Sequence, residues 1–315
     1  MAVIKTVGRS NQKPLLVRLR NDLNRNKYIY LLLLPTIIYF LVFHYYPMYG
    51  AQIAFKNFRP GLGIEGSPWV GLKHFISFFN GRYFKRTVLN TLSISLKDLI
   101  FGFPAPILLA LMINEVQNSH YKKAVQTISY LPHFISQVVI CGLLFEFCSY
   151  TGLFNSIRQA FGLDPILFLQ EPSLFQGIYV ASDIWQGIGW GSIIYLSALT
   201  SIDQEQYESA RLDGAGRLQQ IIYITIPNIL PTIMIMLILR IGKMMSVGSE
   251  KILLLYNPMT YDTADVISTF VYRKGILEAS YSFSAAVGLF NSVINFVLLV
   301  SVNFLSRRLT ESSLW

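Results

Sequence analysis

The chain has 315 residues, of which 53% are hydrophobic and only 14% charged, and its formal net charge at pH 7 is +9. Together with a positive mean hydropathy, this composition excludes an ordinary soluble domain and is typical of a membrane protein with room for several spans of roughly 20 residues. No separate basic domain exists, so the charge fits cytoplasmic flanks and anionic lipid rather than nucleic acid.

A basic segment, 1–27, opens the chain with seven Lys or Arg against a single acidic residue, Asp22, which predicts a cytoplasmic anchor. The apolar run that follows is too long for the usual signal-peptide core, and no small-residue cleavage site comes after it. We therefore predict an uncleaved first span, which Pro35 can kink.

Further apolar stretches bring the predicted total to six spans, at about 28–47, 88–112, 124–148, 174–199, 228–247 and 284–305. The predicted inner regions carry 13 Lys or Arg in roughly 74 residues and the outer loops carry 10 in roughly 100, a modest positive-inside bias. The predicted fold is an all-α polytopic membrane protein. Its transmembrane domain is 28–306, its tail is 307–315, and both ends are cytoplasmic.

Two long outer loops show helical patterns. A Gly/Pro-rich turn within 47–86 leads into an amphipathic stretch with Trp69 and Phe78, expected along the membrane interface. The loop 249–283 is also expected to be partly helical. Either loop could receive an extracytoplasmic partner, and simple connectors with interfacial anchors explain both equally well.

Few side chains carry reactive chemistry. Cys141 and Cys148 lie in one expected helix, about 10 Å apart in rise, and cannot bridge each other without breaking it. The four histidines lack metal-site spacing, and no nucleophile–base constellation stands out. No GxxxxGK[ST] phosphate loop occurs, so the chain cannot cradle ATP in the usual way. We predict a non-enzymatic chain with no catalytic residues, no metal and no cofactor.

The segment 200–227 is polar between two predicted spans and indicates two short helices joined by a turn. Ser201 with Gln204 forms a capping-box pattern that starts the first helix near Ile202. Gly214 can take the left-handed conformation that ends this helix. A second helix then leads to Pro227, which is expected to open the next span.

This segment resembles the EAA loop of ABC importer permeases, with Glu208, Ser209, Ala210, Gly214 and the run Ile224 to Pro227 at intact spacing. It departs from that pattern in Ser209 for Ala and Ile226 for Leu. The resemblance implies a cytoplasmic loop that docks into a separate ATPase. The residues then expected to couple to the ATPase are Glu208, Ser209, Ala210, Arg211, Asp213, Gly214 and Ala215.

From about 28 to 309 the chain resembles LplB-type oligosaccharide and polysaccharide permeases, related to the maltose permease, without that protein's extra outer domain. The resemblance implies an ABC type I permease fold in the bacterial inner membrane. It also implies a second permease forming a heterodimer, two ATP-binding cassette subunits that hold ATP and Mg, and an extracytoplasmic solute-binding protein, often a lipoprotein.

Charges inside spans are costly and usually face a cavity or a partner. Asp183 and Arg240 both lie near mid-depth, and a direct pair between them would reduce the cost of both charges. Nearby aromatic and amide groups suit sugar rings and hydroxyls. The predicted path residues are Asp183, Trp185, Gln186, Trp190, Arg240 and Lys243. Structural pairing between spans, and packing of the tryptophans against lipid, explain the same residues without any substrate.

The function predicted is import of oligosaccharides or polysaccharides. Basic residues in the outer loops and spans are compatible with an acidic, uronate cargo, although headgroup binding explains the loop charges as easily. A neutral sugar or a non-sugar solute stays open. The alternative from another class is an ion-gradient-driven secondary transporter, which would transport without an ATPase.

Overall fold

The computed structural model describes residues 25–310, and these form helices and loops with two isolated β-bridges. Most of the predicted basic segment 1–27, and the tail beyond 310, therefore lie outside the described residues. The chain divides into two units, Met1–Gln52 and Ile53–Trp315.

The described part of the first unit is an apolar helical run. It consists of α2 (Lys27–Phe40), the π turn η1 (Leu41–Tyr45), α3 (Tyr46–Met48) and the 3-10 helix η2 (Tyr49–Phe55), which reaches into the second unit. The whole run, Lys27–Phe55, is long and apolar enough to cross a membrane. The predicted first span lies within it.

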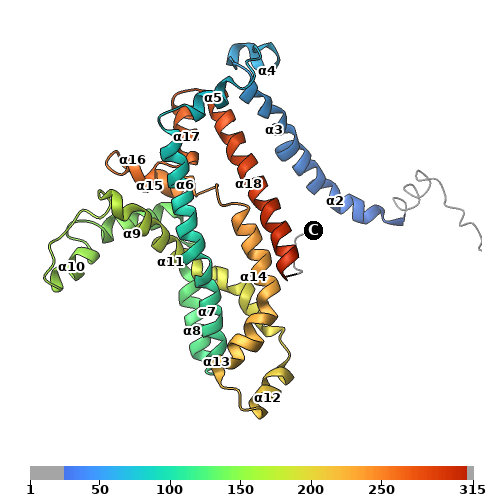
Figure 1. Cartoon of the computed structure of the whole chain (residues 1–315), viewed down its shortest axis with the longest axis vertical. Coiled ribbons are helices and arrows are strands. Elements are labelled where there is room, and N and C mark those ends of the chain that lie inside the picture. Colours follow the sequence, from blue (N-terminus) through green and yellow to red (C-terminus); the bar gives the residue numbers. More distant parts are fainter. Residues whose placement is uncertain (1–24, 311–315) are drawn as a thin grey trace, which may run out of the picture. The chain divides into compact units, whose positions relative to one another are not determined.

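The second unit is built on four long helices. α6 (Phe84–Lys97) continues through the π turn η4 (Asp98–Gly102) into α7 (Pro104–Glu115), and α11 (Pro172–Thr200) packs along α7. α14 (Ile226–Ile241) packs on α18 (Tyr281–Thr310), as Figure 1 shows.

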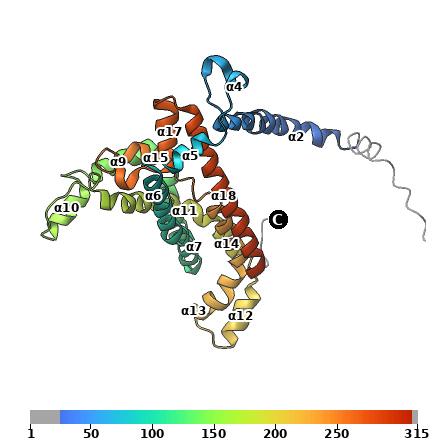
Figure 2. The same ribbon diagram turned by 45° about the horizontal axis from the view of Figure 1, so that its top comes forward.

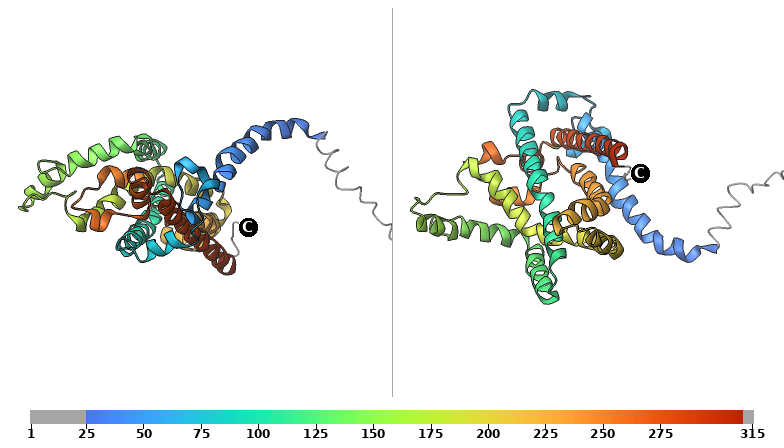
Figure 3. Two further views of the ribbon diagram at one scale, coloured as in Figure 1. Left: turned by 90° about the horizontal axis from the view of Figure 1, so that it is seen from above. Right: turned by 60° about the horizontal axis from the view of Figure 1, so that its bottom comes forward.

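Short helices gather at the two ends of the second unit. α5 (Lys73–Phe79) and α17 (Ile267–Tyr272) lie at one end, the α17 end, and α12 (Gln204–Leu212) and α13 (Arg217–Gln220) at the other, the α12 end (Figures 1 and 2). The remaining elements of this unit are η3 (Pro60–Leu62), α4 (Gly63–Gly66), α8 (Ser119–Tyr130), η5 (Leu131–Phe134), α9 (Gln137–Phe147), α10 (Leu153–Ala160), η6 (Ile221–Thr225), α15 (Ser249–Leu255), α16 (Tyr261–Ala264) and η7 (Arg273–Leu277). α9 and α10 extend to one side (Figure 3).

Three apolar clusters hold the second unit together. One joins α6, α9, α11 and α15 around Phe175 and Ile252, and a second joins α7, α11 and α14 around Ile113 and Ile229. The third, at the α17 end, is centred on Phe78, which is only 2% exposed. Phe78 was expected along the membrane interface. It lies in this core instead, because α5 packs against α18.

Within residues 25–310, four helices are long and apolar enough to span a membrane, namely Lys27–Phe55, Phe84–Glu115, Arg217–Ile241 and Tyr281–Arg308. They overlap the predicted first, second, fifth and sixth spans. The predicted fourth span coincides with α11, whose 29 residues extend about 43 Å. α11 is not among the four, because its Gln, Gly, Ser and Asp residues lower its hydropathy.

The predicted third span, 124–148, is not one straight helix. Its two parts, Ser119–Phe134 and Gln137–Phe147, are bent by 101°. Pro132 lies in the 3-10 turn between them, and the Ser136 hydroxyl accepts a hydrogen bond from the Val139 N–H at 3.4 Å, which starts α9 anew. Apolar composition alone could not reveal this break. With the bent pair counted as one span, the described residues contain up to five candidate spans.

Prolines follow three of the π turns. The residue that follows each of η1, η4 and η6 donates its N–H to the carbonyl five residues earlier. These donors are Tyr46, Phe103 and Ile226, and each directly precedes a proline, namely Pro47, Pro104 or Pro227. The wider turn makes room for a ring that would otherwise clash with the preceding turn. Pro227 lies in the first turn of α14, as predicted, but α14 continues without a break from α13 and η6 in the run Arg217–Ile241.

Gly189 allows α11 to approach the α8 end closely. A Cβ atom at this position would overlap the backbone carbonyl of Ser129, whereas a Cβ at Gly187 would meet nothing within 4 Å. We expect Gly189→Ala to destabilise the protein by about 1–3 kcal/mol, because the helices must move apart. The melting midpoint of the purified protein measures this. Gly187→Ala is the matched control and should leave the midpoint unchanged or higher; equal losses in both variants would contradict the close-packing role.

Candidate functional site

The polar bracket formed by α12 and α13 begins later than predicted. Asp203, not Ser201, is the N-cap of α12, and its Oδ1 accepts a hydrogen bond from the Glu205 N–H at 3.0 Å. The Ser201 hydroxyl instead donates to the Ala198 carbonyl at 2.7 Å and helps to close α11. Both residue types suit an N-cap, and the end of α11, which continues to Thr200, decides between them.

The turn between the two helices is a Schellman motif around Gly214. Gly214 has φ +80°, the left-handed conformation predicted for it. The Ala215 N–H donates to the Ala210 carbonyl at 2.8 Å and the Gly214 N–H to the Arg211 carbonyl at 3.1 Å, which satisfies the free carbonyls at the end of α12. This geometry fixes the direction in which the chain leaves α12.

Side-chain hydrogen bonds fasten the bracket to the following span. The Tyr207 hydroxyl lies 3.0 Å from Thr225 Oγ1, and Asn228 Nδ2 donates to Gln206 Oε1 at 3.0 Å. Thr225 is buried and Tyr207 packs on the apolar cluster of α7, α11 and α14. These contacts join α12 to the helical run that contains α14.

The outer face of the bracket is exposed and partly apolar. Leu212 is 90% exposed and Leu218 70%, although both stand in a polar segment, and Glu208 is exposed beside them. Exposed large apolar side chains on an otherwise polar surface are typical of a protein interface. The predicted coupling residues Glu208 to Ala215 all belong to this helix and turn.

A polar cavity of about 600 Å³ separates the bracket from the end of α7. Its charged lining residues are Glu115, Arg211 and Arg217. Arg211 and Arg217 thus contribute to this inner side of the bracket, which indicates that not every predicted coupling residue faces outward.

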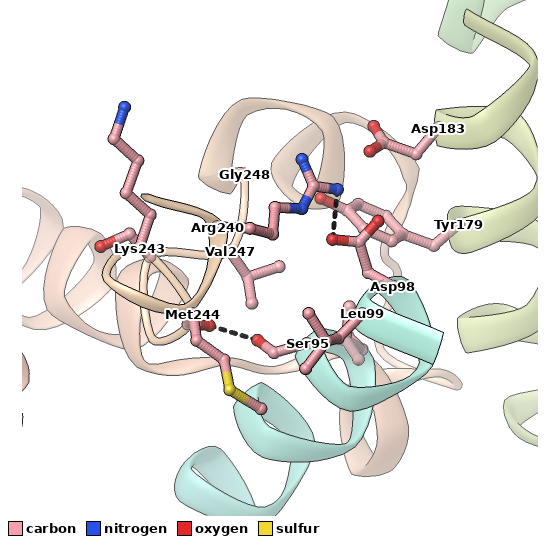
Figure 4. A pocket seen from close by; sticks show the side chains of 12 residues that line it. Ser95, Asp98, Leu99, Tyr179, Asp183, Arg240, Lys243, Met244, Val247 and Gly248 are labelled. Atoms are coloured by element: carbon pink, nitrogen blue, oxygen red, sulfur yellow. Dashed lines mark hydrogen bonds and ion pairs between the residues drawn. The ribbon is translucent and has the colours of Figure 1, made fainter. Parts of the chain in front are cut away.

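A second polar cavity, of about 260 Å³, lies between α6, α11 and α14 (Figure 4). It brings together three of the predicted path residues, Asp183, Arg240 and Lys243, with Asp98 and Tyr179. Tyr179 was not among the predicted path residues. The helical pattern held a signal for Tyr179, since it lies four residues before Asp183 on the same face of α11.

The ion pairs in this region differ from the predicted pair between Asp183 and Arg240. Arg240 pairs with Asp98, and Asp183 pairs with Lys251, whose Nζ lies 3.5 Å from Asp183 Oδ1. Lys251 was predicted in an outer loop, yet α15 packs beside α9 and leaves its side chain only 3% exposed. Because α15 supplies this nearer cation to Asp183, the proposed Asp183–Arg240 pair is wrong.

The other predicted path residues lie elsewhere. Trp185 lines an apolar cavity of about 320 Å³ with Phe147 and Phe154, and Gln186 Nε2 donates to the Ile135 carbonyl at 3.4 Å. Trp190 stacks on His133 with a ring separation of 4.6 Å and an interplanar angle of 3°. These three residues contact the bent helix pair rather than the polar cavity.

A buried carboxylate at the α17 end organises the loop helices. Asp265 is fully buried and accepts hydrogen bonds from Arg273 at 3.1 and 2.7 Å and from Arg86 at 3.1 Å. Burial lowers the pKa of Arg273, but the hydrogen bonds and charges of Asp265 and Tyr256 together raise it, and the net shift is upward. Asn90 on α6 also donates to the Asp265 carbonyl at 3.0 Å, so α6 and α17 are tied together.

Residues 84–311 match the family of the binding-protein-dependent transport system inner membrane component. The chain belongs to this family. It is 42% identical over 294 residues to protein LplB of Bacillus subtilis (strain 168), covering 93% of this chain and 92% of that protein. It is also 42% identical over 299 residues to the polygalacturonan/rhamnogalacturonan transport system permease protein YteP of the same organism, covering 95% and 93%.

Solved structures agree with this assignment. A bacterial ABC transporter involved in the import of the acidic polysaccharide alginate contains a chain that is 49% identical, with a TM-score of 0.87, over 93% of this chain and 99% of that one. A bacterial alginate ABC transporter in complex with its alginate pentasaccharide-bound periplasmic protein gives 48% identity and a TM-score of 0.88, over 94% and 100%. The predicted family is thus confirmed: the chain is a permease of a binding-protein-dependent sugar ABC importer, with the type I fold, in the inner membrane.

Proposed function

We propose that this permease forms half of the translocation path of an ATP-driven importer whose cargo is an acidic, uronate-containing oligosaccharide. The second half is a homologous permease, two ATPase subunits hold ATP and Mg, and a solute-binding protein delivers the cargo from outside. The chain itself binds no cofactor. In this arrangement it crosses the membrane six times, with α11 and the bent pair as two of the crossings and both ends cytoplasmic.

The bracket carries the coupling part of this proposal. Its exposed Leu212 and Glu208 suit a cleft of the ATPase, and Tyr207 and Asn228 connect it to the run Arg217–Ile241. ATP drives transport only if it binds one state of the complex better than the other. Closure of the ATPase pair would therefore move α12 and, through it, the α14 helix.

The two cations in the last turn of α14 and just after it carry the cargo part. Arg240 and Lys243 line the polar cavity, and an intramembrane charge needs an opposite charge nearby. The names of YteP and of the alginate transporter both specify polymers that contain acidic sugars. Arg240 is paired with Asp98, but Lys243 makes no ion pair with any described residue, so a carboxylated sugar suits this site better than a neutral one.

Co-purification and ATPase measurements in lipid test the proposal. The chain should purify with a second permease and two ATPases, and hydrolysis should rise severalfold when the solute-binding protein is loaded with a uronate oligosaccharide. The same binding protein without sugar is the control. Uptake driven by an ion gradient without ATPase subunits would contradict the proposal.

A further inference from the structure

Arg240 and Lys243 line two neighbouring cavities rather than one. The first is the 260 Å³ cavity with Asp98, Tyr179 and Asp183. The second, of about 310 Å³, is lined by both cations together with Gly102, Phe103, Pro106, Gly191, Tyr195, Met236 and Leu239. The Asp98–Arg240 ion pair therefore lies where the two cavities meet.

The two cavities differ in charge. The first has two carboxylates against its two cations, whereas the lining of the second has Arg240 and Lys243 as its charged residues and no carboxylate. Its aromatic residues, Phe103 and Tyr195, offer flat apolar surfaces. The second cavity thus combines the groups that bind a ring carrying a carboxylate.

One positive charge in this region is unmatched within residues 25–310. Asp183 is paired with Lys251 and Asp98 with Arg240, while Lys243 makes no ion pair with any described residue. Binding of one carboxylate would bring the sum over Asp98, Arg240 and Lys243 to zero. Lys243 lies just after the end of α14, beside the span, and an unmatched cation there favours the binding of one anionic group.

The geometry of the Asp98–Arg240 pair allows another carboxylate to replace Asp98. The pair uses Oδ2 of Asp98, while Oδ1 is buried and has no hydrogen-bond partner among the described residues. The carboxylate lies against Gly102, where a Cβ atom would overlap Oδ1, at the end of the π turn. The Arg240 side chain is 45% exposed. A second carboxylate that binds the guanidinium through both oxygens would compete well with this one-sided contact.

We infer that Arg240 is the residue that selects for the cargo carboxylate, and that Asp98 is a built-in competitor which the cargo displaces. Lys243 supplies the second positive charge, and the sugar ring lies against Phe103 and Tyr195. The inference rests on the proposed function and names the specificity-determining residues of the path. Asp98 holds Arg240 in place in the absence of cargo and so prevents an unpaired cation inside the spans.

Equilibrium binding to the full complex in lipid nanodiscs tests this. The probes are a radiolabelled trigalacturonate and its methyl ester, which keeps the rings and removes the charge. Arg240→Gln should weaken trigalacturonate binding at least about tenfold, the loss of a charge-assisted hydrogen bond, and leave the ester unaffected. Asp98→Asn should tighten trigalacturonate binding severalfold, because the competitor is gone. Lys243→Gln should weaken it without touching the ion pair.

The direction of the Asp98→Asn effect decides the question. If Asp98→Asn and Arg240→Gln weaken binding of both probes alike, the pair is structural and the inference is overturned. If the wild-type complex does not prefer trigalacturonate to its ester, the proposed acidic cargo is wrong and the inference falls with it. Glu278→Gln, which removes an ion pair with Lys274 at the α17 end, is the control and should leave both affinities unchanged. Melting midpoints show whether each variant is folded. If Asp98→Asn does not fold, Lys243→Gln still tests whether a positive charge in this region contributes to binding of trigalacturonate.

Discussion

Asp265→Asn is expected to lower the stability of the permease by about 3 kcal/mol, because it leaves two guanidinium groups facing an amide in a buried site. Asp265 is fully buried, and Arg86 and Arg273 both hydrogen-bond to its carboxylate. Thr269 Oγ1 also donates to it at 2.9 Å, so three elements, α6, α17 and η7, depend on one side chain. The melting midpoint of the purified complex should fall by about 5–10 °C.

Asp262→Asn is the matched control for this variant. Asp262 forms an ion pair with the same Arg86 at 3.2 Å, but its side chain is 84% exposed. Exposed pairs contribute little because water and salt screen them. We therefore expect a change of no more than about 1–2 °C. Equal shifts in the two variants would show that burial of Asp265 is not the source of the stability.

Local signals in the sequence predicted the bracket well. The left-handed turn at Gly214 needs only a residue without a Cβ atom, so the glycine itself predicts the turn. The starting point of α12 was placed wrongly because Ser201 and Asp203 are both good N-caps, and only the length of α11 separates them. Helix boundaries that depend on a neighbouring element escape a local pattern.

Partner choice among the intramembrane charges could not be predicted. The sequence identified Asp183 and Arg240 as costly charges in spans, and both line the polar cavity. Yet Asp98 and Arg240 are 142 residues apart, and their contact depends on the π turn that directs Asp98. Lys251 reaches Asp183 only because α15 folds inward from a segment that composition assigns to a loop.

The prolines also show that a local pattern does not determine where a helix ends. Pro227 and Pro132 both look like helix boundaries in the sequence. The run Arg217–Ile241 continues through Pro227 because η6 widens before it, whereas the chain bends by 101° near Pro132, where a 3-10 turn precedes the N-cap of α9. A proline cannot complete the regular hydrogen bonding of the α-helical turn before it. Packing of the neighbouring helices decides whether the chain forms a π turn and continues, or bends and starts a new helix.

Ser209→Pro is expected to abolish the link between sugar binding and ATP hydrolysis. Ser209 is an interior residue of the nine-residue helix α12, where a proline costs about 3 kcal/mol because it removes an N–H and clashes with the preceding turn. Glu208 and Leu212 would then leave their present positions on the exposed face. Hydrolysis stimulated by loaded solute-binding protein should fall at least about tenfold in the reconstituted complex.

Ser209→Ala separates this effect from loss of the side chain. Ser209 is exposed, and alanine favours the helix, so stimulated hydrolysis should equal that of the wild type. Neither of the two cavities that Arg240 lines includes any residue of α12, so binding of trigalacturonate should be the same in both variants. A permease that carries Ser209→Pro, remains folded by its melting midpoint and still imports sugar at the wild-type rate would show that force does not enter the spans through α12.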